Sequence, residues 1–285
     1  MATFNEKKTC NQRMEEFKRF VWNPDTKEFM GRTPGKWVLI ILYYGAFYVV
    51  MCALFALALF LLLTTTDPYT PTYQDQLKSP GVTIRPEPRG LKISFNISNP
   101  KSWQYYVNTL QHFLSAYNES IQAKTSRNCS MGNYTIQSGY GPNSKYACQF
   151  TREMLKNCSG LEDPTFGYKA GQPCILIRMN RIINYLPGNG TTPNVTCGVL
   201  HAYPESIGDV VFYPDNGTFD LSYFPYYGRQ PQPNYTNPLV AVKFLSLKKN
   251  RHFEIQCKIN GPGIINDNPY EKFEGRVIFH LDIQK

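Results

Sequence analysis

One uninterrupted apolar stretch, residues 37–63, constrains this chain more than any other feature of its sequence. No charged residue occurs between Lys36 and Asp67, and sixteen of the residues from Val38 to Leu63 are Leu, Ile, Val or Phe. A bilayer core of about 30 Å needs roughly 20 helical residues, so the stretch can cross it with some tilt. The apolar region of a cleaved signal peptide would be shorter, about 7–15 residues, and nearer the N-terminus. The sequence therefore predicts one membrane-spanning helix over residues 37–63.

Basic residues precede this stretch and are missing directly after it. Residues 1–36 carry eight Lys or Arg against five acidic residues, whereas no basic residue follows the stretch until Lys78. Since basic flanks stay cytoplasmic, we expect residues 1–36 to form a cytoplasmic tail and residues 67–285 to lie outside, in a type II orientation. The net charge of +9 is spread over both sides and forms no basic patch with interleaved aromatics, which argues against nucleic-acid binding.

The cysteines agree with this topology, because six of the eight lie beyond the apolar stretch and only Cys10 and Cys52 lie elsewhere. An even number in an oxidising compartment predicts three disulfides, although six cysteines allow 15 pairings. No Cys-x-x-Cys spacing occurs and the four histidines are scattered, so we expect no metal site and no cofactor. The six outer cysteines are Cys129, Cys148, Cys158, Cys174, Cys197 and Cys257.

Triplets for N-linked glycosylation occur only beyond the apolar stretch. One triplet arises easily by chance, but nine on one side and none on the other indicate a glycosylated outer region. We expect lower occupancy at Asn128 and Asn157, because the middle residue of each triplet is a cysteine whose disulfide competes with modification. The nine asparagines are Asn96, Asn118, Asn128, Asn133, Asn157, Asn189, Asn194, Asn216 and Asn234.

Four aromatic residues lie in the first half of the apolar stretch: Tyr43, Tyr44, Phe47 and Tyr48. Spacings of four place Tyr44 beneath Tyr48 and Tyr43 beneath Phe47 on the helix surface. An interfacial aromatic belt is the alternative, but Tyr48 lies roughly 16 Å from Trp37, close to mid-bilayer. A hydroxyl in hydrocarbon needs a partner, so we interpret these residues as contacts to a helix of another protein.

The outer region has the patterns of a short stalk followed by a β-rich domain. Residues 64–90 are rich in proline and lack periodicity, which predicts an extended stalk. Residues 91–97 then alternate as a strand, and Asn99-Pro100 begins an amphipathic helix over Lys101–Tyr117. Further alternating apolar residues predict strands around residues 175–179, 195–199, 219–223, 253–259 and 277–283.

The predicted strands also suggest how the outer cysteines pair. Cys197 and Cys257 both point into a core from separate strands, which suits a bridge between two sheets. The pairs Cys129–Cys148 and Cys158–Cys174 then follow from proximity in the sequence. Residues 91–285 are thus predicted to form a disulfide-stapled antiparallel β-sandwich with one prominent α-helix.

Several motifs, in order along the chain and together with all six outer cysteines, are typical of one known family. They are Phe-Met-Gly-Arg-Thr at 29–33, Tyr-Tyr-Gly-x-Phe-Tyr at 43–48, Tyr-Gln-Asp-Gln-Leu at 73–77 with Pro80-Gly81, Asn-Cys-Ser-Gly at 157–160, Arg-Met-Asn-Arg at 178–181, Tyr-Phe-Pro-Tyr-Tyr-Gly at 223–228 and Asn-Pro-Leu-Val-Ala at 237–241. Over essentially its whole length the chain resembles the β-subunits of potassium-transporting P-type ATPases, the sodium/potassium and proton/potassium pumps.

The resemblance implies an immunoglobulin-like outer fold, the same disulfide pairing, no catalytic role and a place in the plasma membrane. It also implies a 1:1 complex with a catalytic α-subunit. The β-subunit supports the folding, assembly and delivery of this α-subunit and modulates its potassium affinity and conformational equilibrium. Membrane lipid and N-linked glycans are its other expected partners. One aromatic segment is expected to dock on an extracellular loop of the α-subunit, with a packed turn as the alternative: Tyr223, Phe224, Pro225, Tyr226, Tyr227 and Gly228.

Two sets of motifs point to different members of the family. Residues 13–17 and 67–71 resemble the proton-pump type, whereas residues 117–123 resemble the second sodium-pump isoform. The proton-pump type has a tyrosine in a tail internalisation motif where this chain has Phe20, which weakens the expectation of endocytosis through that motif. We favour a proton/potassium pump subunit, and the sodium/potassium pump stays the alternative.

Two other classes of protein share this topology. A Golgi glycosyltransferase usually needs paired acidic residues for a metal–nucleotide, and no Asp-x-Asp occurs in the chain. Neither a Ser/His/Asp signature, a phosphate-binding glycine loop nor a histidine metal motif occurs, so we expect no enzymatic activity. A free-standing adhesion glycoprotein would fit the sandwich and the sugars, but its membrane helix would need only hydrophobicity and no mid-membrane tyrosines.

Overall fold

The computed structural model describes residues 9–74, 77, 79–200 and 208–285 of the chain. The chain divides into two compact units, an N-terminal unit, Met1–Thr66, and a C-terminal domain, Asp67–Lys285. The first eight residues of the predicted tail lie outside the described residues, as do Asp75 and Gln76 of the 73–77 motif.

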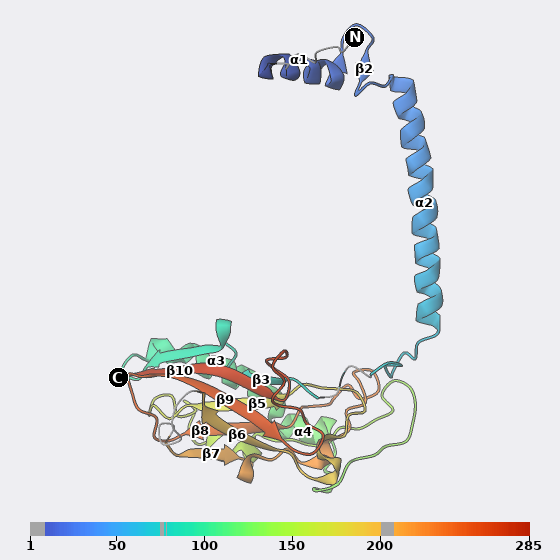
Figure 1. The fold of residues 1–285 in the computed structure, drawn as a ribbon. Coiled ribbons are helices and arrows are strands. Elements are labelled where there is room, and N and C mark those ends of the chain that lie inside the picture. Colours follow the sequence, from blue (N-terminus) through green and yellow to red (C-terminus); the bar gives the residue numbers. More distant parts are fainter. Residues whose placement is uncertain (1–8, 75–76, 78, 201–207) are drawn as a thin grey trace. The chain divides into compact units, whose positions relative to one another are not determined.

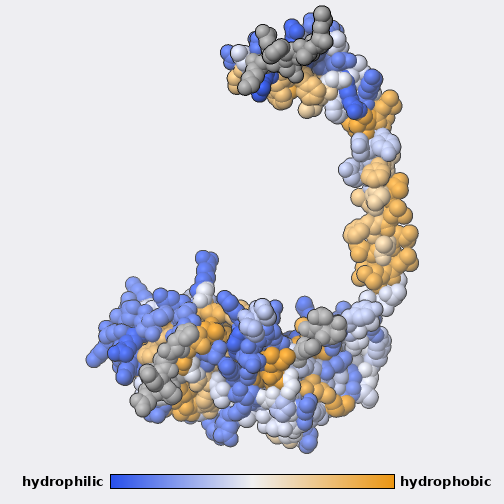
Figure 2. Space-filling model, in the orientation of Figure 1, coloured by the Kyte–Doolittle hydropathy of each residue, from blue (hydrophilic) through white to orange (hydrophobic). Residues whose placement is uncertain are grey.

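The prediction of a membrane-spanning helix is confirmed by α2 (Pro34–Thr64), which Figure 2 shows as a mostly hydrophobic surface with a paler band across it. Among the described residues it is the one helix long and apolar enough to cross a membrane, and nothing in the chain buries it. Pro34 occupies the first turn, where its missing N–H leaves no partner unsatisfied. At the other end, the hydroxyls of Thr64, Thr65 and Thr66 donate to carbonyls three residues earlier, at 2.7–2.9 Å.

A helix and a small hairpin precede α2 in the N-terminal unit (Figure 1). The helix is α1 (Cys10–Val21), and the hairpin pairs β1 (Trp22–Asn23) with β2 (Glu28–Phe29). The indole N–H of Trp37 donates to the carbonyl of Phe29 at 2.8 Å, and their rings contact with centroids 5.8 Å apart. The hairpin is therefore fastened to the first turn of the membrane helix.

Two four-stranded sheets form the core of the C-terminal domain (Figure 1). The first sheet has the order β4 (Lys92–Asn96), β10 (Arg276–Gln284), β9 (His252–Asn260), β6 (Asn194–Val199). The second has the order β3 (Val82–Arg85), β5 (Cys174–Met179), β8 (Leu239–Phe244), β7 (Val210–Tyr213). Inward side chains of the two sheets meet, as where the rings of Phe244 and Phe279 lie 6.4 Å apart.

The central strands of the second sheet, β5 and β8, are buried on both faces. A sheet buried on both faces needs a third layer, and helical segments supply it. The Cys158–Cys174 disulfide ties one of them to β5, and Arg85 of β3 lies over the ring of Phe113 in another, 5.5 Å from its centroid. The helical elements are α3 (Pro100–Leu114), α4 (Glu119–Thr125), η1 (Arg89–Leu91), η2 (Ser115–Tyr117), η3 (Arg152–Cys158), η4 (Pro187–Gly190), η6 (Asp215–Gly217) and η7 (Leu221–Tyr223).

The predicted amphipathic helix is confirmed as α3, whose last predicted residues form the 3-10 turn η2. The Asn99 side chain accepts from the N–H of Lys101 at 3.2 Å, and Pro100 takes the first helical position. The apolar stripe faces the core as expected: Trp103, Tyr106, Val107, Leu110 and Leu114 are buried.

The stalk prediction is wrong for Val82–Arg85, which forms strand β3. Val82 and Ile84 are each only 1% exposed, because the strand pairs with β5 along the edge of the second sheet. Four residues are too short a run for alternation to distinguish a strand from a stalk in a proline-rich segment, so pairing with β5 decided the conformation.

The strand predicted over residues 219–223 is also wrong. Phe219, Leu221 and Tyr223 are all buried, but the chain turns there as η7. The Asp220 carboxylate accepts from the N–H of Ser222 at 2.9 Å, which stabilises a turn in place of a strand.

The cysteines pair as predicted, but the geometry of the Cys197–Cys257 bridge differs from the prediction. The two residues lie directly opposite each other on neighbouring strands β6 and β9, with Cα atoms 4.1 Å apart. The bridge therefore joins strands within one sheet and does not connect two sheets. Alternation predicts only that each cysteine points towards the core. Two neighbouring strands of one sheet and two strands of facing sheets both meet this condition.

The expectation of an entirely antiparallel sandwich fails at one pairing. Strand β4 runs parallel to β10, with Ile93 opposite Leu281 and Phe95 opposite Ile283. A parallel pair needs a long connection, and nearly the whole domain lies between these two strands in the sequence. The other pairings within both sheets are antiparallel.

Loss of the Cys197–Cys257 bridge should cost the domain more than loss of a local bridge. The 60-residue separation predicts that replacing both cysteines by Ser lowers the free energy of unfolding by about 4 kcal/mol. Removing Cys129–Cys148, with a separation of 19, should cost about 3 kcal/mol. Urea unfolding of the two purified variants and their surface expression measure this difference. Equal or reversed losses would contradict the loop-closure argument.

Candidate functional site

The aromatic residues of α2 form a contiguous exposed patch on the helix. Tyr43, Tyr44, Phe47 and Tyr48 are 46–67% exposed in the chain. The ring centroids of Tyr44 and Tyr48 lie 6.3 Å apart, and Phe47 meets Tyr48 edge-on at 5.6 Å. Within the described part of the chain, the hydroxyls of Tyr43, Tyr44 and Tyr48 form no hydrogen bond. The patch therefore offers rings and free hydroxyls to a partner in the membrane.

The segment 223–228 lies inside the C-terminal domain between two other segments of chain. The carbonyl of Phe224 accepts from the N–H of Thr135 at 2.9 Å, and the carbonyl of Tyr226 accepts from the N–H of Asn184 at 2.8 Å. Tyr223 is 5% exposed, and its hydroxyl donates to the carbonyl of Gln149 at 3.0 Å. Burial raises the pKa of Tyr223 above its ordinary value. Much of the segment is thus packed against its own domain.

Tyr226 and Tyr227 differ in their surroundings. Tyr226 is 8% exposed, with its ring 4.7 Å from that of Tyr235 and the Arg181 guanidinium over both rings. Tyr227 is half-buried, and its hydroxyl accepts from the N–H of Gln137 at 2.7 Å. The ammonium of Lys145 lies 4.4 Å from the Tyr227 ring. Tyr227 is therefore the ring of this segment that reaches the domain surface.

The first residues of the C-terminal domain are fastened to its surface, a contact that sequence reasoning missed. The Asp67 carboxylate accepts from the N–H groups of Tyr69 and Thr70 at 2.7 and 2.8 Å, and from the hydroxyl of Tyr140 at 3.0 Å. The rings of Tyr69 and Tyr140 meet edge-on, 5.0 Å apart. The two backbone N–H groups hold the pKa of Asp67 below its ordinary value. We call this arrangement the Asp67 clasp.

A shallow depression of about 190 Å³ adjoins the Asp67 clasp. Tyr69, Tyr140 and Tyr227 contribute rings to its lining, and Lys145 contributes a cation. Tyr140 is 70% exposed. Accessible tyrosine rings are enriched at protein-binding surfaces. The prolines of the 67–71 motif indicate a loop at Asp67. Tyr140 lies 73 residues further along the chain, and no spacing rule predicts that it contacts Asp67.

Comparison with known proteins decides the family. A family model described as the sodium/potassium ATPase beta chain matches residues 7–279. The chain belongs to that family. Potassium-transporting ATPase subunit beta of Rattus norvegicus is 52% identical and that of Homo sapiens is 50% identical, each over the full length of both chains. Sodium/potassium-transporting ATPase subunit beta-2 of Ochotona curzoniae is 46% identical, also over the full length of both.

Two motifs shared with the family meet at one buried side chain, Asn237. Its amide donates to the carbonyl of Met179 at 2.8 Å, and its oxygen accepts from the guanidinium of Arg181. The hydroxyl of Tyr117 donates to the Asn237 backbone carbonyl at 3.1 Å, and burial raises the pKa of Tyr117 to about 12. The 178–181 and 237–241 motifs therefore hold the covering layer on the second sheet, and they carry no reaction chemistry.

A third family motif, residues 157–160, ends at a position that only glycine fits. Gly160 has a φ of +73°, and an added Cβ would lie 2.4 Å from the ring of Phe166. The carbonyl of the preceding Ser159 accepts from the buried Arg152 guanidinium at 2.9 Å and 2.6 Å. This motif, too, is a packing element of the family fold.

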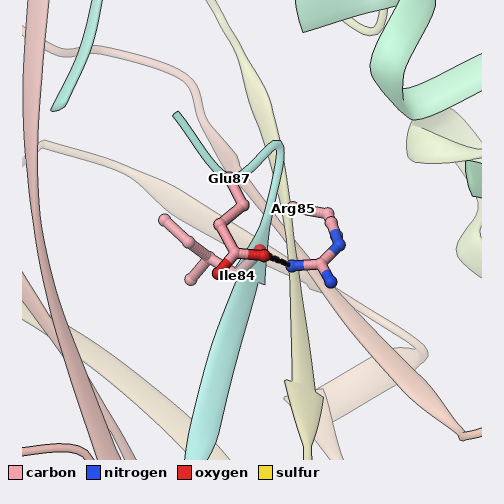
Figure 3. A network of polar contacts seen from close by, with 3 residues as sticks. All are labelled: Ile84, Arg85 and Glu87. Atoms are coloured by element: carbon pink, nitrogen blue, oxygen red, sulfur yellow. Dashed lines mark hydrogen bonds and ion pairs between the residues drawn. The ribbon is translucent and has the colours of Figure 1, made fainter. Parts of the chain in front are cut away.

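The positive charge of Arg85, the last residue of β3, is compensated by Glu87 (Figure 3). Arg85 donates to the carbonyl of Ile84 at 2.9 Å and forms an ion pair with Glu87. Burial, and next the nearby positive charge of Arg85, hold the pKa of Arg178 below its ordinary value. Glu87 thus offsets the positive charges of Arg85 and Arg178.

In the described part of the chain, no group of three or more His, Cys, Asp or Glu residues could hold a metal ion.

The nine glycosylation triplets differ in the exposure of their asparagines. Six of these residues are exposed and three are half-buried; the half-buried ones are Asn96, Asn118 and Asn194. Asn118 has its side-chain oxygen bound by Arg152 at 3.1 Å, and Asn194 begins strand β6. Both asparagines of the cysteine-containing triplets, Asn128 and Asn157, are exposed, so their predicted lower occupancy depends on disulfide timing alone. Occupancy at all nine stays a prediction.

Replacing Tyr226 by Ala should destabilise the domain, because the ring is buried against Tyr235 and Arg181. We expect a loss of about 3 kcal/mol in the free energy of unfolding. The matched Tyr226→Phe variant keeps the ring and should be nearly neutral. Urea unfolding of the purified chain measures both. A Tyr226→Ala variant with wild-type stability would show that the ring packs less tightly than its surroundings indicate.

The Asp67 clasp should respond to acid in a defined direction. The pKa of Asp67 is lowered in the folded state from 3.8, so its contribution is full above pH 3.8 and is lost as pH falls through the lowered pKa. The amides of Tyr69 and Thr70 should be protected from hydrogen exchange at about pH 6, after correction for its intrinsic pH dependence, and should lose protection in acid as pH falls through the lowered pKa of Asp67.

The Asp67→Ala variant is the control for this measurement, because it should lack protection under both conditions. Peptides from β9 should stay protected in both proteins, which separates local opening from unfolding. Equal protection of Tyr69 and Thr70 in the variant and the wild type would remove Asp67 from the clasp.

Proposed function

We propose that this chain is the non-catalytic β-subunit of a proton/potassium pump, in a 1:1 complex with the catalytic α-subunit at the plasma membrane. One observation carries the choice of pump: identity to potassium-transporting ATPase subunits beta is 50–52%, against 46% for a sodium/potassium-transporting subunit beta-2, all at full length. The chain's role is to support the folding, assembly and delivery of the α-subunit and to modulate its potassium affinity and conformational equilibrium.

The orientation in this proposal is type II, with the N-terminus in the cytoplasm. The eight basic residues before α2 and the absence of any before Lys78 support it. The three disulfides of the C-terminal domain support an outer location, since disulfides persist in oxidising compartments. Glycans on the exposed asparagines would then keep the outer surface soluble.

Two surfaces would contact the α-subunit in this complex. The first is the patch of Tyr43, Tyr44, Phe47 and Tyr48. The three tyrosine hydroxyls would donate hydrogen bonds to acceptors on the α-subunit within the membrane. The second is the depression beside the Asp67 clasp, where Tyr227 and Tyr140 are accessible. The buried members of the 223–228 segment, Tyr223 and Tyr226, would support the second surface from beneath and not touch the partner.

A sodium/potassium pump is the second candidate, favoured by the 117–123 motif and by 46% identity to subunit beta-2. Co-expression with the α-subunit of either pump, followed by detergent extraction, distinguishes the two. We expect stable 1:1 co-purification and potassium-activated ATPase activity with the proton/potassium α-subunit. Preferential assembly with the sodium/potassium α-subunit would reverse the assignment, and co-purification with neither would leave an adhesion glycoprotein.

The membrane tyrosines should tune the pump and not merely hold it. Interhelical hydrogen bonds in membranes are worth about 0.6 kcal/mol on average, with a maximum near 1.7 kcal/mol. Two such bonds made in one pump conformation only would shift its population roughly tenfold. We therefore expect Tyr44→Phe with Tyr48→Phe to preserve assembly and to change apparent potassium affinity and dephosphorylation rate.

The comparison requires matched expression of variant and wild type, with ATPase activity titrated against potassium. Val49→Ala is a suitable control, because it alters the same helix without removing a hydroxyl. If affinity and dephosphorylation are unchanged while assembly is intact, the tyrosines are passive packing residues.

A further inference from the structure

Helix α1 carries an apolar face that nothing in the described chain covers. Met14, Phe17 and Phe20 are 56–61% exposed. At about 100° per residue, these side chains fall with Cys10 and Val21 in an arc of roughly 120°. Figure 2 shows hydrophobic surface on one side of this helix and hydrophilic surface on the other. An exposed apolar face of this width needs a partner.

The hairpin after α1 extends this apolar surface towards the membrane helix. Trp22, Phe29 and Met30 are each 44–52% exposed. The N–H of Met30 donates to the carbonyl of Val21, the last residue of α1, at 3.0 Å. The carbonyl of Phe29 accepts the indole N–H of Trp37 in the first turn of α2. Hydrogen bonds thus connect the end of α1 to the start of the membrane-spanning helix.

Two basic residues lie in or beside the apolar face of α1. By the same helical geometry, Arg13 lies within the arc, between Phe17 and Phe20, and Lys18 lies just outside it, beside Met14. Their long side chains can reach outwards while their methylene groups stay on the apolar side. Glu15 and Arg19 fall on the opposite face, and Glu16 lies outside the arc, beyond Phe20. An apolar arc with arginine and lysine in it or beside it is typical of helices that lie in a membrane interface and bind anionic lipid.

We propose that α1 lies in the plane of the membrane, with its apolar face in the cytoplasmic leaflet and with Arg13 and Lys18 on anionic lipid headgroups. The assignment to the cytoplasmic leaflet rests on the type II orientation proposed above. Two observations favour lipid over a protein groove: the apolar surface is continuous with the start of α2, and the charges of Arg13 and Lys18 complement anionic headgroups. The tail is then a membrane-bound segment and not a free tether.

Spin labels on the full chain in lipid nanodiscs test the proposal. Cys10 is a free thiol within the apolar arc, and replacing Cys52 by Ala leaves Cys10 as the single free thiol, since the other six form disulfides. A matched label at Glu15→Cys, in a Cys10→Ser and Cys52→Ala background, reports the opposite face. Accessibility to oxygen and to an aqueous nickel reagent gives the depth of each label.

In nanodiscs with phosphatidylserine we expect the label at Cys10 to be accessible to oxygen and shielded from nickel, and the label at position 15 to show the reverse. Lys18→Gln should weaken the docked state about fivefold. Phe17→Ser should weaken it about tenfold. Pure phosphatidylcholine should also lower the docked fraction. The nanodisc holds this chain alone, so the measurement is independent of assembly with a pump.

Two results would overturn the proposal. Aqueous labels at both positions in anionic nanodiscs would show that α1 does not enter the membrane interface. Shielding of Cys10 that appears only when a pump α-subunit is co-assembled, whatever the lipid charge, would assign the apolar face to a protein groove.

Discussion

A polypeptide that crosses hydrocarbon must satisfy its backbone N–H and C=O groups within itself, and the rest of this molecule depends on that requirement. Helix α2 meets it over 31 residues, with threonine hydroxyls on its last carbonyls and the Trp37 indole fastened to the preceding hairpin. The helix divides the chain into two unlike parts. All three disulfides and all nine glycosylation triplets lie on one side of it.

Beyond the helix, a second constraint organises the C-terminal domain: strands β5 and β8 are buried on both faces. One face packs on the other sheet, and the second face needs the helical layer. Asn237 and the Cys158–Cys174 disulfide hold that layer in place. Motifs shared with the ATPase beta chain family therefore have structural roles here, which agrees with an accessory subunit that performs no chemistry of its own.

Three of the features proposed to contact a partner or the membrane lie close to the membrane helix in the sequence. The tyrosine patch is on α2, the uncovered face of α1 ends 13 residues before it, and Asp67 follows it by three residues. The 223–228 segment instead has most of its rings inside the domain. Its value to a complex would come from the surface that it supports around Tyr227.

The sequence by itself determined the membrane helix and helix α3, because each depends on composition or on the spacing of apolar residues within a few turns. The cysteine pairing was also predicted correctly. The sequence could not determine β3, since Val82 and Ile84 become a strand only by pairing with β5. Nor could it decide that Cys197 and Cys257 share one sheet, or that Tyr140 binds Asp67. Those contacts join residues 60 or more positions apart, and only the packed tertiary structure brings such residues together.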